Sequence, residues 1–204
     1  MKLYLIRHGE TDYNKQKRNQ GRIDIPLNEY GRELAVKTKA GLADIPFSLC
    51  LSSPLVRARE TAELILAGRD VPMITDQRII EVSFGEYEGR CWNPEAWDER
   101  MPRGFQCFFD EPGKYQAPAD GESLEALKER TGDFLRDICH RKDYAEYTIL
   151  VSTHGAALAG ILANIKNLPV ERFWGDGCSS NCGVTEVLVE DGIPKILSEN
   201  VTYY

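Results

Sequence analysis

The chain has 204 residues, of which 42% are hydrophobic and 28% charged, and its formal net charge is −7. This length predicts a single domain over residues 1–204, large enough to bury one substantial core. The negative charge argues against nucleic acid as a partner, because binding a phosphate backbone draws on a surplus of Lys and Arg. No segment approaches the roughly 18 apolar residues that a membrane span requires.

The N-terminal segment and the cysteines bear on the compartment. The first apolar run is stopped by Arg7, which is too early for a secretory signal, and the six cysteines are scattered along the chain. We therefore expect reduced thiols in a cytoplasmic protein.

Short apolar runs alternate with amphipathic stretches along most of the chain. In chain order we predict a strand at 2–7, a helix at 28–41, a strand at 46–52, a helix at 54–67, a strand at 71–75, a helix at 123–140, a strand at 147–153, a helix at 155–165, and strands at 184–189 and 195–201. The dipeptide Asp191-Gly192 is typical of a hairpin turn between the last two strands. This alternation predicts an α/β fold with a mostly parallel sheet, helices on both faces, and an added antiparallel pair.

Residues 91–121 form one long irregular stretch that is rich in Pro, Gly and aromatic residues. Long irregular segments often cover a binding site, so we expect a lid here. The alternative is an insertion that takes no part in catalysis. Its aromatic side chains either line a pocket for an apolar or ring-bearing leaving group or form a small core that holds the segment shut.

Basic and imidazole side chains gather where predicted strands end. Arg7 and His8 follow the first strand, Arg57 follows the second, and His154 follows the strand at 147–153. Ligands of open α/β sheets bind at the carboxyl ends of the strands, so these side chains are expected to share one cleft. Two guanidinium groups match the oxygens of a phosphoryl group, and a neutral imidazole nitrogen can attack its phosphorus.

Four sequence blocks around these residues resemble the signature blocks of a known family. LIRHGETDYN, SSPLVRARETA, EVSFGEYEG and VSTHG are similar, in this order and spacing, to those of the histidine phosphatase superfamily, which includes the cofactor-dependent phosphoglycerate mutases and their phosphatase relatives. The resemblance implies a three-layer α/β/α sandwich with the site at the carboxyl edge of a mostly parallel sheet. We expect neither a metal nor another cofactor, since the adjoining arginines would repel a cation.

The resemblance also implies roles for individual residues. His8 would be the phosphorylated nucleophile, Arg7 and Arg57 would bind the phosphoryl oxygens, and His154 would donate to the same oxygens. Glu81, the first residue of EVSFGEYEG, would give a proton to the leaving oxygen and later act as the base for the attacking water.

Some assignments leave alternatives. Glu86 and Glu88 lie close enough to Glu81 to be confused with it. Asn14 and Gln20 match positions that contact the phosphate or frame its pocket, but Asn14 also suits a simple turn. The run Cys178-Ser-Ser-Asn-Cys182 has a possible metal spacing without a second pair of ligands, so we do not expect zinc there.

The form of the third block and the short chain favour a phosphatase over a mutase. The predicted substrate is a small phosphomonoester: a sugar phosphate, a phosphoglycerate, α-ribazole phosphate or a nucleotide-like ester. Mutase-type phosphoryl transfer is one alternative. A non-catalytic phosphate-binding module on the same fold is another, although no member of the catalytic set is lost. The apolar C-terminal hairpin is compatible with a homodimer.

Overall fold

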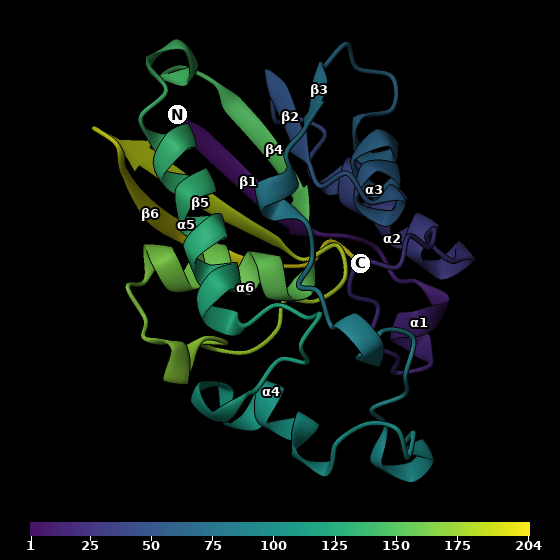
Figure 1. Ribbon diagram of the computed structural model, residues 1–204. Helices are drawn as coiled ribbons and strands as arrows, with labels where there is room; N and C mark the ends of the chain where they lie inside the picture. The colour runs from purple at the N-terminus through teal and green to yellow at the C-terminus, as the bar shows by residue number, and fades with distance from the viewer.

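The computed structural model describes the backbone of residues 1–204 and every side chain except those of Pro94 and Arg103. A six-stranded sheet in the order β3-β2-β4-β1-β5-β6 crosses the molecule (Figure 1). Strands β3, β2, β4 and β1 are parallel, whereas β5 runs antiparallel to β1, and β6 to β5. The strands are β1 (Lys2–Arg7), β2 (Leu49–Ser52), β3 (Met73–Thr75), β4 (Thr148–Thr153), β5 (Val184–Glu190) and β6 (Ile193–Val201).

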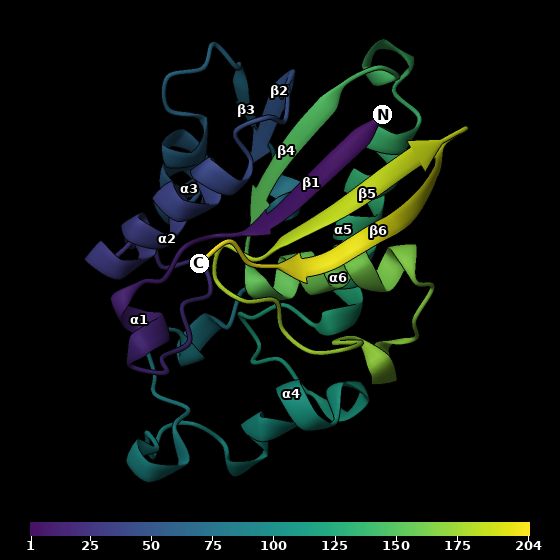
Figure 2. The same cartoon turned by 180° about the vertical axis from the view of Figure 1, so that it is seen from behind.

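Helices cover both faces of the sheet (Figures 1 and 2). The alternation of side chains along a strand decides which face each residue serves. Leu3 and Leu5 pack with residues of α5 and α6, whereas Tyr4 and Ile6 pack with residues of α2 and α3. The predicted three-layer α/β/α sandwich is thus confirmed. The longer helices are α2 (Glu29–Gly41), α3 (Val56–Leu66), α5 (Leu124–Cys139) and α6 (Gly155–Ile165).

Most predicted elements are present, with small differences at their ends. Helix α3 begins at Val56 rather than at residue 54, because Leu55 is still extended. Strand β6 begins at Ile193, two residues earlier than predicted, so that only Asp191 and Gly192 form the turn, both with positive φ. Helix α1 (Asp12–Lys15), a single turn that begins with a capping box from Thr11, was not among the predicted elements.

The segment 91–121 contains only short helices and lies beyond the carboxyl ends of the parallel strands (Figures 1 and 2). Phe105 and Phe108 are each 1% exposed and belong to a cluster that includes Phe84 and the first residues of α6. These two rings form part of a small core, which is one of the two predicted alternatives. A cavity of about 320 Å³ lies beside this core, lined in part by Tyr87, Phe105 and Tyr115.

The short helices of the chain outside α1 are η1 (Gln77–Ile79), η2 (Gly85–Tyr87), η3 (Pro94–Ala96), η4 (Arg103–Gln106), α4 (Cys107–Asp110), η5 (Pro112–Lys114), η6 (Lys142–Tyr144) and η7 (Val170–Arg172).

Among the described residues, no helix combines the length and the apolar character needed to cross a membrane.

Candidate active site

The register between β1 and β4 brings two histidines together. Arg7 at the end of β1 pairs with Thr153 at the end of β4. The backbone N–H of His8 donates to the Thr153 carbonyl at 2.9 Å. The next residue of each strand is a histidine, and the ring centroids of His8 and His154 lie 5.2 Å apart. The imidazole that follows this apolar strand therefore lies beside the imidazole that follows β4, at the carboxyl edge of the sheet.

His8 is held in one tautomer. Its Nδ1 lies 2.6 Å from the carbonyl oxygen of Gly9, and since a carbonyl can only accept, Nδ1 carries the hydrogen. The side chain is buried, and this burial, followed by the charges of Arg57 and Arg7, holds the pKa of His8 well below its usual range. At neutral pH the ring is therefore uncharged, and its Nε2 carries a lone pair.

Arg57 is a fully buried cation held by loop carbonyls. From the first turn of α3, its Nη1 donates to the Ile23 carbonyl at 2.8 Å and its Nη2 to the Gly21 carbonyl at 2.7 Å. Burial lowers the pKa of Arg57 to about 10, while the Glu81 carboxylate acts in the opposite direction. The guanidinium thus stays charged at neutral pH, close to both His8 and Glu81.

Arg7 is held by the segment that precedes β5. Its Nη1 donates to the Ser179 carbonyl at 2.6 Å and to the Cys178 sulfur at 3.4 Å. The backbone N–H of Cys182 in turn donates to the Arg7 carbonyl at 2.9 Å. Of the two cysteines of the possible metal pair, Cys178 therefore contacts the Arg7 guanidinium through its sulfur, whereas Cys182 contacts Arg7 through the backbone.

His154 is fully buried, and its Nε2 lies 2.6 Å from the hydroxyl of Ser53. Burial first, and then the charge of Arg57, holds the pKa of His154 well below its usual range. Among the described side chains, Nδ1 of His154 and Nε of Arg7 and Arg57 are buried without a hydrogen-bond partner. Unpaired buried polar groups are costly, and the oxygens of an anion would be suitable acceptors for the two guanidinium donors.

The side chain of Glu81 lies at the N-terminal end of α6. Its Oε1 accepts from the backbone N–H groups of Val82 and Ala157, both at 3.0 Å, and its Oε2 accepts from that of Ala156 at 3.2 Å. Ala156 and Ala157 belong to the first turn of α6, directly after His154. The carboxylate of Glu81 is therefore placed beside His154.

The other two glutamates of this block lie elsewhere. The Glu86 side chain is 60% exposed and lies 4.0 Å from Arg90. Glu88 accepts from the backbone N–H groups of Arg22 and Phe84 and so braces two loops. Of these three glutamates, Glu81 is the one in contact with the start of α6, which favours it over the alternatives.

Asn14 and Gln20 both contact Thr11. The side-chain oxygen of Asn14 accepts from the Thr11 backbone N–H at 3.1 Å, and the Thr11 hydroxyl lies 2.9 Å from Oε1 of Gln20. Thr11 is fully buried, three residues after His8. In this structure, the two amides frame the loop after His8 through Thr11, and their contact with a phosphate stays a prediction.

Sequence reasoning missed Thr11 and Ser53 as parts of this site. Thr11 had a usable signal, because Thr-x-x-Asn at 11–14 is a capping pattern directly after the Arg-His-Gly run. Ser53 had none beyond its place at the end of β2, since its contact with His154 depends on the pairing of β2 with β4.

Residues 3–202 match a family described as the histidine phosphatase superfamily (branch 1). The chain therefore belongs to this superfamily.

The similar proteins include two curated phosphatases and a solved structure. Phosphoserine phosphatase 1 from Hydrogenobacter thermophilus is 30% identical over 202 residues, covering 99% of this chain and 93% of that protein. Adenosylcobalamin/alpha-ribazole phosphatase from Escherichia coli K12 is 30% identical over 174 residues, covering 85% and 83%. The structure of Bacillus stearothermophilus YhfR has a TM-score of 0.90 at 32% identity, covering 99% of this chain and 98% of that one. The predicted family, its phosphatase branch and the fold class are confirmed.

Proposed function

We propose that this phosphatase hydrolyses a small phosphomonoester, without a metal ion, through a phosphohistidine on His8. The observation that carries the proposal is the state of His8: a buried, neutral imidazole whose Nδ1–H is committed to the Gly9 carbonyl, which leaves Nε2 for attack. Arg7, Arg57 and His154 surround it and supply the charge and hydrogen bonds that a phosphoryl group needs.

In the first step, the lone pair of His8 Nε2 attacks phosphorus. The new N–P bond forms as the ester P–O bond breaks, and the leaving oxygen takes both electrons of that bond. Glu81, in its acid form, donates a proton to this oxygen. Arg7 and Arg57 stabilise the charge on the other phosphoryl oxygens, and this electrostatic stabilisation is the main catalytic term in phosphoryl transfer.

In the second step, a water attacks the phosphohistidine. The Glu81 carboxylate takes a proton from this water as its oxygen bonds to phosphorus. The N–P bond breaks, its electrons return to Nε2, and inorganic phosphate leaves. Glu81 is then in its acid form and His8 neutral, so that both groups are ready for the next cycle.

The names of two relatives point to alkyl phosphate esters: one is a phosphoserine phosphatase and the other an adenosylcobalamin/alpha-ribazole phosphatase. An alkoxide is a poor leaving group, so such esters need a proton donor such as Glu81. We also propose that segment 91–121 covers the site and that the protein works in the cytoplasm, where its six unpaired cysteines would stay reduced.

The test is hydrolysis of O-phosphoserine, α-ribazole phosphate and p-nitrophenyl phosphate, with and without EDTA. His8→Ala should abolish turnover of all three, while His140→Ala, at an exposed histidine, serves as the matched control. Rapid acid-free quenching followed by intact mass analysis should show one added phosphoryl group that is lost on acid treatment.

Several outcomes would contradict the proposal. Turnover by His8→Ala, or loss of activity in EDTA that added metal restores, would exclude the mechanism. Isomerisation of phosphoglycerate at a rate above hydrolysis would assign the protein to mutase-type transfer instead. Phosphate binding by the wild type without turnover of any ester would indicate the non-catalytic module.

A further inference from the structure

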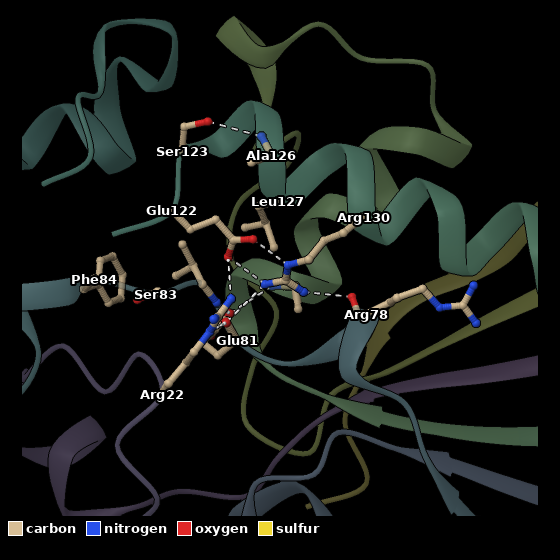
Figure 3. Close-up of polar contacts among 12 residues, drawn as sticks. Arg22, Arg78, Glu81, Ser83, Phe84, Glu122, Ser123, Ala126, Leu127 and Arg130 are labelled. Carbon is tan, nitrogen blue, oxygen red and sulfur yellow. Dashed lines mark hydrogen bonds and ion pairs between the residues drawn. The ribbon is translucent and has the colours of Figure 1, made fainter. Parts of the chain in front are cut away.

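Three charged side chains form a cluster against the main chain of Glu81 (Figure 3). The Glu122 carboxylate bridges the other two. It accepts from Arg130 Nε at 2.6 Å and Nη2 at 2.8 Å, and from Arg22 Nη2 at 3.3 Å. We call Arg22, Glu122 and Arg130 the bridging cluster.

Both arginines of the bridging cluster donate to one backbone oxygen. Arg22 Nε lies 3.3 Å and Arg130 Nη2 3.1 Å from the Glu81 carbonyl, and Arg130 Nη1 also donates to the Arg78 carbonyl at 2.8 Å. Residue 81 lies between η1 and η2, outside any strand or helix. The two charged donors therefore take the place of a regular hydrogen-bond pattern in fixing this part of the backbone.

The bridging cluster borders the loop that holds the phosphate-binding arginine. Arg22 lies between Gly21 and Ile23, whose carbonyls both accept from Arg57. Arg57 thus holds this loop through backbone carbonyls, without the Arg22 side chain, whose own contacts are with the Glu81 carbonyl and Glu122. Loss of the Arg22 contacts would therefore release the carbonyl of Glu81 and leave Arg57 in place.

Glu122 keeps the two guanidinium groups together. Its side chain is 12% exposed and that of Arg130 18%, so solvent screens their pairing only in part, whereas Arg22 is 43% exposed. Without this negative charge, two cations would converge on one carbonyl oxygen and repel each other. An amide in place of the carboxylate also turns an NH₂ group toward a guanidinium, which can only donate.

We propose that Glu122 is a positioning residue for Glu81: it holds Arg22 and Arg130 on the Glu81 carbonyl and so keeps the proton-carrying carboxylate in line with the leaving oxygen. This inference rests on the proposed role of Glu81 as proton donor. It predicts a leaving-group effect. Esters that need a proton on the leaving oxygen should depend on Glu122, and esters with a stable leaving anion should not.

The test compares kcat/KM for O-phosphoserine, whose alkoxide needs a proton, with kcat/KM for p-nitrophenyl phosphate, whose phenolate leaves without one. For each substrate, kcat/KM reports the steps up to and including formation of the phosphohistidine. Glu122→Gln should lower kcat/KM for O-phosphoserine by about tenfold or more, and that for p-nitrophenyl phosphate by less than about twofold. Glu81→Gln, the reference variant, should show the same selectivity with a loss of about 10²- to 10⁴-fold.

Two further variants guard against a loss of folding. Arg22→Gln removes the bond from an exposed side chain to the Glu81 carbonyl and leaves Glu122 paired with Arg130. It should lower kcat/KM for O-phosphoserine by less than Glu122→Gln does, and again more than it lowers kcat/KM for p-nitrophenyl phosphate. Its melting temperature should be near that of wild type. Glu86→Gln, at an exposed glutamate five residues after Glu81, should leave kcat/KM for both substrates unchanged.

The outcomes separate this inference from the proposed function. Suppose that Glu81→Gln lowers kcat/KM for O-phosphoserine more than kcat/KM for p-nitrophenyl phosphate. If Glu122→Gln and Arg22→Gln then lower kcat/KM equally for both substrates, or for neither, Glu122 is not a positioning residue. If Glu81→Gln itself lowers kcat/KM equally for both substrates, the proposed role of Glu81 as proton donor is wrong, and the inference about Glu122 fails with it.

Discussion

Gly31→Ala is expected to impair catalysis by displacing the loop that follows His8. A Cβ built on Gly31 would lie 2.1 Å from the carbonyl oxygen and 2.6 Å from the nitrogen of Glu10. To restore an ordinary contact of about 3.4 Å, α2 and this loop must separate by about 1.3 Å. Neither side yields easily, because the Asn28 N–H donates to the Glu10 carbonyl at 3.0 Å and the Asn28 side chain to the Glu10 carboxylate at 2.9 Å.

Two effects of opposite sign decide the stability of Gly31→Ala. Alanine stabilises a helix by about 1 kcal/mol relative to glycine, whereas overpacking costs about 1–3 kcal/mol. Since the clash is with backbone rather than with a flexible side chain, we expect net destabilisation of about 1–2 kcal/mol. A displacement of this size beside the nucleophile should lower kcat/KM by about 10²-fold.

Urea unfolding and kcat/KM for p-nitrophenyl phosphate measure the two effects of Gly31→Ala. The control is Gly104→Ala, because a Cβ built there meets nothing within 4 Å. If Gly31→Ala proves more stable than wild type and as active, helix propensity outweighs the clash, and close packing of α2 does not position the loop after His8.

Three other perturbations test the site. Below about pH 6.5 the unfolding free energy should fall by up to about 1.4 kcal/mol per pH unit for each of His8 and His154, because the unfolded chain binds protons that the folded state, with its lowered pKa values, does not. Urea unfolding from pH 7 to 5 measures this fall, and a flat profile would contradict the prediction. Arg57→Lys should lower kcat/KM by about 10²-fold and the free energy of unfolding by about 2 kcal/mol, since the compact ammonium lacks the planar fork with which the guanidinium reaches both loop carbonyls. Steady-state kinetics and thermal unfolding measure the two effects, and wild-type values would show that the shape of the guanidinium is not required. Ser53→Ala removes the hydroxyl 2.6 Å from His154 and should lower kcat/KM by about tenfold, whereas an unchanged rate would show that Ser53 does not orient the imidazole.

The sheet and the two histidines were predictable because they depend on local patterns and on one general rule. Apolar runs mark the strands, and parallel strands present their last residues at a common edge. Arg7, His8 and His154 therefore needed only a correct reading of where β1 and β4 end. Their convergence follows from the register between these strands.

The supports of the site were not predictable in the same way. Arg57 is held by the carbonyls of Gly21 and Ile23, and any residue type can offer a carbonyl. The contact of Ser53 with His154 depends likewise on the pairing of distant strands. The aromatic residues of segment 91–121 could be counted in the sequence, but only the packing shows that Phe105 and Phe108 are buried in a small core.

The position of β1 in the sheet has a consequence for how the enzyme is made. Both neighbours of β1, β4 and β5, come from residue 148 onward. At ribosomal rates, the first strand waits on the order of ten seconds before either partner has been synthesised. During that time it presents an apolar segment with two unpaired edges, which is the kind of segment that chaperones bind and that aggregates. Activity should therefore appear only late, once β4 and the segment that holds Arg7 have both reached β1, and nascent chains stalled before residue 148 should have none.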